Sequence, residues 1–171
     1  MKKNLYMQRI GKKAMTASLH LSNTDINKKN STLKQFSKYL KKYSRLILNA
    51  NKKDISAAKS KKIKISMIER LKLNNKKIKQ IRNSINEIIK FEDPLGKILS
   101  QWKRPNGLTI KKIPIPIGVI GVIYESRPNV TSDVSALCFK TGNVVILRGG
   151  SEAFNSNKIL AKLFKRALRK K

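Results

Sequence analysis

The chain has 171 residues, of which 40% are hydrophobic and 29% charged, so one domain with a buried core is expected and disorder throughout is excluded. Forty Lys and Arg residues against 9 Asp and Glu give a formal net charge of +31, which excludes basic partners and raises nucleic acid or an anionic membrane as candidates. However, 31 of the 40 basic residues are lysine, and isoleucine (21) and asparagine (15) are also abundant. The three residue types share A/T-rich codons rather than a physical role, so we attribute most of the lysine to solvated surface rather than to phosphate binding, which favours arginine.

Residues 1–94 carry the apolar spacing of helices. One helix is predicted by apolar residues that recur every three or four positions, namely Leu33, Phe36, Leu40, Tyr43 and Ile47. Thr24 and Asp25 are candidate caps for its start. A second helix is predicted by Ile78, Ile81, Ile85 and Ile88, and Asp93-Pro94 is expected to stop it. A shorter helix is expected over residues 67–73.

From residue 95 onward the pattern becomes that of strands. Residues 95–102 and 108–113, separated by Arg104-Pro105-Asn106-Gly107, predict a hairpin. Residues 117–124 are a run of β-branched residues and glycine that ends in Tyr124, apolar on both faces, which predicts a parallel strand covered on both sides. A helix over 131–141, a turn at Gly142-Asn143, a second buried strand over 144–147 and an amphipathic helix over 154–168 are expected to follow.

The order strand, helix, strand, helix predicts an α/β fold with a right-handed crossover, the start of a Rossmann-like doubly wound sheet. A two-stranded parallel sheet cannot bury its faces or hide its edges, so we expect an incomplete domain with a portion missing after Lys171. The expected organisation is a helical segment over 1–94, a hairpin and connection over 95–114, and a truncated dinucleotide-binding βαβα unit over 115–171.

The single cysteine and single histidine limit the chemistry. Cys138 excludes a disulfide framework and a multi-cysteine zinc site, and we expect no metal site. A catalytic thiolate must be accessible and activated, whereas Cys138 is predicted to lie mid-helix with Val134 and Leu137, facing the sheet as a core residue. His20 is expected to be structural or solvated. No apolar run follows the basic start, and the longest apolar stretch, 113–124, is too short to span a bilayer, so a cytoplasmic location is expected.

Two segments follow the strand ends, where open α/β sheets bind ligands: residues 124–129 and 148–152. In the second, Gly149-Gly150 lets the backbone approach a phosphate, and the next helix N-terminus and Arg148 add N–H groups and a positive charge. A plain turn with an exposed arginine explains this segment equally well. Neither common nucleotide-binding glycine motif follows either strand.

Two blocks of sequence resemble the γ-glutamyl phosphate reductase family of the aldehyde dehydrogenase superfamily. They are Ile115-Pro116-Ile117-Gly118-Val119-Ile120-Gly121-Val122-Ile123-Tyr124-Glu125-Ser126-Arg127-Pro128-Asn129-Val130-Thr131 and Lys140-Thr141-Gly142-Asn143-Val144-Val145-Ile146-Leu147-Arg148-Gly149-Gly150-Ser151-Glu152. Upstream, residues 47–51 with Asp54, Glu69-Arg70-Leu71 and Asp93-Pro94-Leu95-Gly96 match in order. The resemblance covers nearly the whole chain but only the N-terminal portion of the family's proteins. This sequence departs from the family's pattern at Pro114, where the family is expected to have a basic residue.

The resemblance implies the NADPH-dependent reduction of L-glutamate 5-phosphate to L-glutamate 5-semialdehyde and phosphate, a step of proline biosynthesis. In this family a cysteine thiolate attacks the acyl carbon, phosphate leaves, and a hydride reduces the thioester. By motif match, Asn129 would donate to the oxyanion, although a helix cap beside Pro128 is a rival role for it. Arg148, Gly149, Gly150 and Ser151 would bind the cofactor. The family's nucleophilic cysteine lies downstream, on a segment that this chain does not have.

Three interpretations follow. The chain is the N-terminal portion of such a reductase, an inactive remnant decaying in an A/T-rich genome; it is half of a split enzyme, completed by a separate C-terminal chain; or it is a basic nucleic-acid-associated protein. A complementary C-terminal chain or a homo-oligomer is the possible protein partner. Against the third, the lysines are spread over both halves and most aromatic residues are spaced like core residues. We therefore expect a small-molecule acyl phosphate substrate, no specific nucleic acid and no membrane partner, and an isolated chain without reductase activity.

Overall fold

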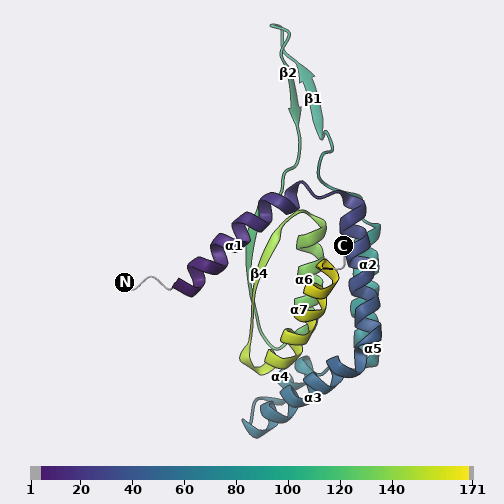
Figure 1. Cartoon of the computed structure of the whole chain (residues 1–171), viewed down its shortest axis with the longest axis vertical. Coiled ribbons are helices and arrows are strands. Elements are labelled where there is room, and N and C mark those ends of the chain that lie inside the picture. Colours follow the sequence, from purple (N-terminus) through teal and green to yellow (C-terminus); the bar gives the residue numbers. More distant parts are fainter. Residues whose placement is uncertain (1–4, 170–171) are drawn as a thin grey trace.

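Helices dominate the first half of the chain, and two small sheets lie in the second half (Figure 1). This computed structural model describes residues 5–169. Its elements, in chain order, are α1 (Leu5–Ser22), α2 (Ile26–Lys42), α3 (Ser44–Ser60), α4 (Ile65–Leu71), α5 (Asn75–Lys90), β1 (Ser100–Lys103), β2 (Thr109–Lys112), β3 (Val119–Tyr124), α6 (Pro128–Lys140), β4 (Val144–Gly149), a 3-10 turn over Ser151–Ala153 and α7 (Phe154–Leu168). The mixed α/β class expected from the sequence is confirmed.

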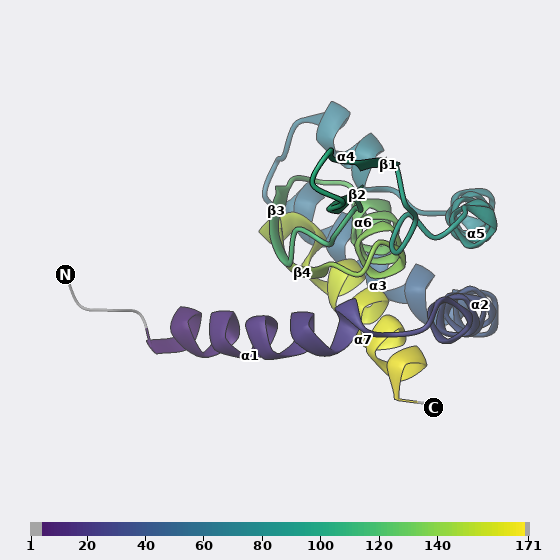
Figure 2. The same ribbon diagram turned by 90° about the horizontal axis from the view of Figure 1, so that it is seen from above.

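One hydrophobic core joins helices from both ends of the chain. α2 and α5 lie side by side (Figure 2), and α6 and α7 pack against them. Leu33, Phe36 and Ile85 are completely buried in this core. The ring of Phe164, on α7, meets Phe36 edge-on with centroids 5.0 Å apart, a geometry favoured by the quadrupoles of the two rings. The N-terminal helices thus hold α7 and also α6, which packs on β4 of the second sheet.

The single helix expected over residues 33–47 is wrong, because α2 ends at Lys42 and α3 begins at Ser44. Tyr43 has φ −105° and ψ 21°, outside the helical region, although its N–H still donates to the Tyr39 carbonyl. The flanking positions Leu40 and Ile47 are completely buried, so the spacing identified the buried face but not the bend. The bend directs α3 towards α7, which it contacts.

The predicted hairpin is confirmed, with shorter strands than expected. β1 and β2 pair antiparallel from Ser100↔Lys112 to Lys103↔Thr109 and project away from the body of the molecule (Figure 1). At the turn, Arg104 N–H donates to the Leu108 carbonyl at 2.9 Å, and Gly107 takes a φ of +86°. A positive φ of this size suits glycine, which explains the residue at this position.

The predicted parallel pair is also confirmed. β3 and β4 pair from Val119↔Val144 to Tyr124↔Gly149, and α6 connects them. α6 packs on β4 but begins at Pro128, earlier than expected, because proline suits the first turn of a helix. The expectation of cover on both faces is wrong: Ile123 is 81% exposed and Ile117 83% exposed. Within residues 5–169, no element packs over the side chains of these two positions.

A buried polar cluster fixes the start of α7. The Asp54 carboxylate, only 2% exposed, accepts the backbone N–H groups of Asn155 (3.0 Å) and Ser156 (2.7 Å) and both of their side chains. A carboxylate at a helix N-terminus accepts hydrogen bonds from otherwise unpaired N–H groups and interacts favourably with the positive end of the helix dipole. Asn51, 1% exposed, bonds Ser156 Oγ and the backbone of Leu71 and Leu73. This cluster thereby positions the loop between β4 and α7.

Candidate functional site

The carboxyl ends of β3 and β4 bring the two predicted site segments together. Ile123 pairs with Arg148 and Tyr124 with Gly149, so the loops that follow both strands leave the same end of the sheet. Asn129 lies in the first turn of α6, directly after the first of these loops. The expectation that Asn129 and Arg148 lie at one end of the sheet is confirmed.

The loop after β3 is clamped to the loop after β4 by a buried serine. Glu152 Oε1 accepts the Ser126 N–H at 2.6 Å and the Ser126 hydroxyl at 2.9 Å, and the Gly150 N–H donates to the Tyr124 carbonyl. Ser126 is 2% exposed and has an unusual φ of +27°. Burial raises the pKa of Glu152, but hydrogen bonds from Ser126 and from its own backbone outweigh this and hold the pKa below its ordinary value.

The four residues predicted for cofactor binding, Arg148, Gly149, Gly150 and Ser151, line one open cavity of about 470 Å³. Its wall is completed by Tyr124, Thr131, Leu147, Phe154, Asn157, Lys158 and Ala161. Arg148 and Lys158 are exposed, and the Lys158 ammonium lies 5.5 Å from the centre of the Phe154 ring. Two cations beside side-chain-free backbone are suited to phosphate groups. Their role in cofactor binding stays a prediction.

The glycine pair at the end of β4 lies in close contact with neighbouring side chains, which would have to move to admit a Cβ. A Cβ added to Gly149 would overlap the Asn157 amide and lie 3.0 Å from the Tyr124 ring. A Cβ added to Gly150 would overlap the Glu152 carboxylate. The φ of Gly150, −61°, is ordinary for any residue, so it is the missing side chain and not backbone freedom that matters.

A hydrogen-bonded chain links this cavity to α6. The Tyr124 hydroxyl and Thr131 Oγ1 are 2.6 Å apart, and Thr131 Oγ1 donates to Asn157 Oδ1 at 2.9 Å. Burial raises the pKa of Tyr124, opposed by its bond to Thr131. The chain therefore fixes the relative positions of β3, α6 and α7 around the cavity.

Asn129 lies in a different, smaller cavity of about 220 Å³. Its walls come from α6 and from the α4–α5 region: Asn129, Asp133, Arg70, Leu73, Lys77, Gln80, Ile81 and Ser84. Asn129 Nδ2 donates to Asp133 Oδ2 at 3.1 Å. Arg127 is the N-cap residue of α6, without a side-chain capping bond. The Asn129 side chain therefore contacts Asp133 and the cavity rather than capping the helix.

Asp133 was not identified by the sequence reasoning. Its Oδ1 atom is buried without a hydrogen-bond partner, and burial raises its pKa against the opposing effect of the Asn129 bond. The signal that could have found it is its spacing, because residues i and i+4 share a helix face. Arg70, on α4, and Lys77, on α5, carried no such signal, because they come from other helices and reach Asn129 only in the folded chain.

Cys138 is buried, as predicted, at 8% exposure. Burial raises the pKa of its thiol, which disfavours the thiolate that a nucleophile needs. Cys138 lines neither of the two cavities at the carboxyl end of the sheet. The expectation that its neighbour Leu137 faces the core is wrong, because Leu137 is 43% exposed.

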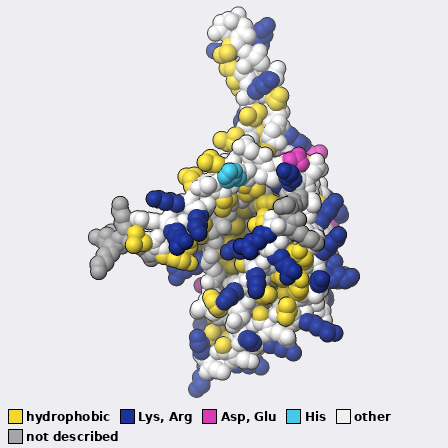
Figure 3. Space-filling model, in the orientation of Figure 1, with side chains coloured by type: hydrophobic (Ala, Val, Ile, Leu, Met, Phe, Trp, Pro, Cys, Tyr) yellow, Lys and Arg dark blue, Asp and Glu magenta, His cyan; other side chains and the backbone are white. Residues whose placement is uncertain are grey.

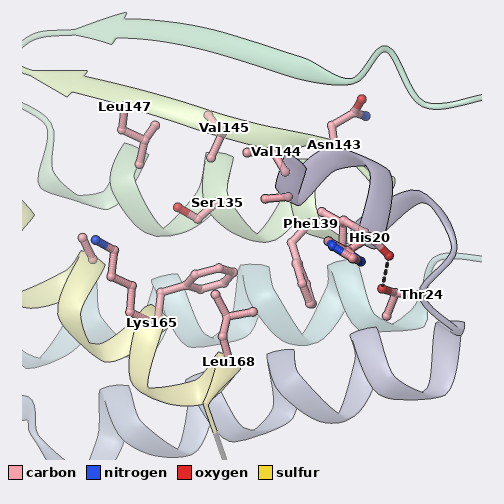
Figure 4. Close-up of a pocket in the computed structure, with 14 residues that line it drawn as sticks. His20, Thr24, Ser135, Phe139, Asn143, Val144, Val145, Leu147, Lys165 and Leu168 are labelled. Carbon is pink, nitrogen blue, oxygen red and sulfur yellow. Dashed lines mark hydrogen bonds between the residues drawn. The ribbon is translucent and has the colours of Figure 1, made fainter. Parts of the chain in front are cut away.

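A larger cavity, about 660 Å³, lies elsewhere, between α1, α6, β4 and α7 (Figure 4). Its lining is mainly apolar, including Val145, Phe139 and Leu168. His20 is exposed at this cavity, and its carbonyl accepts the Thr24 hydroxyl at 2.9 Å. Figure 3 shows an apolar hollow beneath His20 with basic side chains scattered over the body around it. None of the predicted site residues lines this cavity.

Among residues 5–169, no three His, Cys, Asp or Glu side chains gather in an arrangement that could hold a metal ion. In the same part of the chain, every helix is too short or too polar to cross a membrane. Both findings concern only the part of the chain that the structure describes.

Comparison with known sequences identifies close relatives, although no family model matches the chain. This chain is 50% identical over 159 residues to a γ-glutamyl phosphate reductase of Clostridium perfringens (strain SM101). The match covers 93% of this chain and 38% of the relative. A γ-glutamyl phosphate reductase of Clostridium tetani is 46% identical over 160 residues, 94% of this chain and 37% of the relative. The chain thus spans less than half the length of these relatives.

Solved structures give the same result for the fold. The γ-glutamyl phosphate reductase from Thermotoga maritima matches with a TM-score of 0.89 and 39% identity, covering 92% of this chain and 38% of that one. The enzyme of the same name from Saccharomyces cerevisiae matches with a TM-score of 0.90 and 33% identity, covering 94% and 41%. A benzaldehyde dehydrogenase from Corynebacterium glutamicum, at 20% identity and a TM-score of 0.70, shares the fold.

Proposed function

The chain matches the N-terminal portion of γ-glutamyl phosphate reductases, and we propose that it forms that portion of an enzyme reducing L-glutamate 5-phosphate to L-glutamate 5-semialdehyde and phosphate. The observation that carries the proposal is identity of about half over 93% of the chain, together with a matching fold. The position of Asn129 and Arg148 at one end of the parallel pair supports the proposal, with the two residues in separate cavities.

Asn129 is the proposed oxyanion donor. When a thiolate attacks an acyl phosphate, negative charge develops on the carbonyl oxygen, and a prepositioned N–H group stabilises it. The Asn129 amide has two N–H bonds, of which one donates to Asp133, so the other is available to the substrate. The N-terminal turn of α6 adds the positive end of its helix dipole at the same place.

Arg148, Gly149, Gly150 and Ser151 are the proposed cofactor-binding residues, and they fit a phosphorylated dinucleotide. The cavity carries the charges of Arg148 and Lys158, and the glycines present backbone without side chains. NADPH would supply the hydride for the reduction. The proposed task of these residues is to hold its phosphate groups.

The nucleophile is proposed to come from outside this chain. Cys138, the one cysteine in the sequence, is buried on α6 with a raised pKa and lies away from Asn129's cavity. We therefore expect the chain alone to be inactive. A protein with this chain would turn over once a downstream portion supplies an accessible thiolate.

A chimera tests this proposal. This chain replaces the corresponding N-terminal portion of the Clostridium perfringens relative, and NADPH oxidation is followed with L-glutamate 5-phosphate. Turnover is expected from the chimera, and Asn129→Ala should lower kcat by roughly 10²–10³, the usual effect of losing an oxyanion donor. Asn86→Ala, an exposed asparagine on α5, is the matched control and should keep full activity.

The outcomes separate the remaining interpretations. A folded chimera without turnover, or full activity in Asn129→Ala, would contradict the proposal. Activity from the lone chain would refute the proposed external nucleophile. Activity that appears when the chain is mixed with a separate C-terminal portion would favour a split enzyme over an inactive remnant.

A further inference from the structure

The cavity that contains Asn129 has opposite charges on opposite walls. α6 contributes Asp133, and Arg70 and Lys77 come from α4 and α5. Asp133 is the one acidic residue among those that line this cavity in the described part of the chain. A site for a bare phosphate would carry cations alone, whereas a cavity with both signs of charge suits a zwitterion.

The Asp133 carboxylate has an unused acceptor. Oδ2 accepts the Asn129 amide, while Oδ1 is buried with no partner. A buried acceptor left without a donor costs about 1–3 kcal/mol and more when it is charged, so this carboxylate has the capacity to accept a further donor. Rotation about the Cβ–Cγ bond exchanges its two oxygens, because this torsion has a broad energy profile. Either oxygen can therefore face the cavity.

The opposite wall is suited to a carboxylate. Lys77 Nζ donates to the Lys72 carbonyl at 2.6 Å and to the Glu69 carbonyl at 3.3 Å, which holds its ammonium in place. These bonds use two of its three N–H donors, so one is left. Arg70 is exposed on α4 and offers a planar fork of donors that matches a carboxylate.

The spacing along α6 matches a glutamyl chain. Asn129 and Asp133 are four residues apart, slightly more than one turn, or about 6 Å along the helix axis. In glutamate, two methylene groups separate the acyl carbon from the α-carbon. An acyl group held at Asn129 therefore places the α-carbon within reach of Asp133.

We propose that this cavity binds the α-amino-acid head group of the substrate, with Asp133 accepting the α-ammonium and Arg70 and Lys77 facing the α-carboxylate. The inference rests on the proposed function, since it assigns the orientation of the substrate in the same site. Asp133 then has two roles: it holds the Asn129 amide in place and selects substrates that carry an α-amino group.

Titrations of the full 171-residue chain test this assignment, with binding followed by calorimetry. The probes are L-glutamate, glutarate, which lacks the α-ammonium, and 4-aminobutyrate, which lacks the α-carboxylate. L-Glutamate is expected to bind at least tenfold more tightly than either analogue. Asp133→Asn should weaken the binding of L-glutamate by at least tenfold and leave the affinity for glutarate unchanged. Glu87→Gln, which removes an exposed carboxylate on α5, should leave the affinity for all three probes unchanged.

A second variant keeps the test decisive if Asp133→Asn fails to fold. Arg70→Gln alters an exposed side chain, so the fold is expected to be retained. Arg70→Gln should weaken the binding of L-glutamate but not the binding of 4-aminobutyrate. Absence of L-glutamate binding to the unaltered chain, equal binding of glutarate, or unchanged L-glutamate binding in both variants would overturn the assignment.

Activity of the chimera distinguishes this inference from the proposed function. If L-glutamate binding depends on Asp133 while the chimera shows no turnover, the reductase function fails and the head-group site stands. If the chimera turns over and Arg70→Gln leaves KM for L-glutamate 5-phosphate unchanged, the function stands and the head-group site fails. The expected result is a raised KM with an unchanged kcat.

Discussion

The helical core and the β3–β4 sheet differ in how far each is buried by the described chain. Leu33, Phe36 and Ile85 are inaccessible to solvent, whereas Ile117 and Ile123 are 83% and 81% exposed. In α2 and α5, apolar residues alternate with lysines, so each buried face has a matching solvated face. In β3 the apolar residues occupy both faces, and residues 5–169 cover only one of them. α2 and α5 therefore encode their own degree of burial, while the parallel strand depends on elements supplied elsewhere.

The largest effect is expected from the core of the helices. Phe36→Ala should lower the free energy of unfolding by about 3–5 kcal/mol, because it removes a buried ring and leaves a cavity beside Phe164. Urea unfolding followed by circular dichroism measures this change. Phe91→Ala, at a phenylalanine that is 55% exposed, is the control and should cost far less. Equal losses would show that the packing of α2 is not what stabilises the molecule.

A smaller loss is expected at the polar cluster that fixes α7. Asp54→Asn keeps the size of the side chain but places an NH₂ group against the donors of Asn155 and Ser156. The expected cost is about 2–3 kcal/mol, typical of losing hydrogen bonds to a buried charged group. Asp25→Asn is the control, because asparagine is as good an N-cap as aspartate. If both variants unfold at the same urea concentration, the cluster does not anchor α7.

The clamp between the two loops predicts a pH dependence. The pKa of Glu152 is lowered in the folded protein, so its ionised form stabilises the fold above the ordinary pKa of glutamate. This contribution should be lost as the pH falls through the lowered value. Urea unfolding at a series of acid pH values should show a smaller decline in stability for Glu152→Gln than for the unaltered chain. Parallel curves for the two proteins would contradict the assignment of this titration to Glu152.

The smallest effect tests the comparison directly with one substitution in both regions. Ile85→Val should cost about 0.5–1.5 kcal/mol, as for a buried methylene. Ile123→Val should fall within about 0.5 kcal/mol of zero, as for other surface changes. Both values come from urea unfolding curves. An equal cost at Ile123 would mean that its face of the sheet is covered in solution.

Short-range features were predictable, and the candidate site was predictable in part. Strand ends and their order placed Asn129 and Arg148 at one end of the sheet, and helical spacing placed Cys138 in the interior. The spacing of residues 154–168 predicted a helix with the bounds of α7. Each of these features depends on interactions between residues close in sequence or on the fixed direction of a parallel pair.

Other features were decided by the tertiary structure alone. The bend at Tyr43, the Asp54 carboxylate at the start of α7 and the opposition of Arg70 to Asp133 have no local signature. Asp54 and Ser156 lie about one hundred positions apart in the chain, and their contact exists only because α3 packs on α7. Likewise, Asp133 of α6 meets Arg70 of α4 and Lys77 of α5 only in the folded chain. The sequence determined which helix faces are apolar and where the strands end, because both depend on the local periodicity of the backbone. Which of these faces and strand ends meet was decided by the tertiary structure, because the shared core brings distant helices into contact.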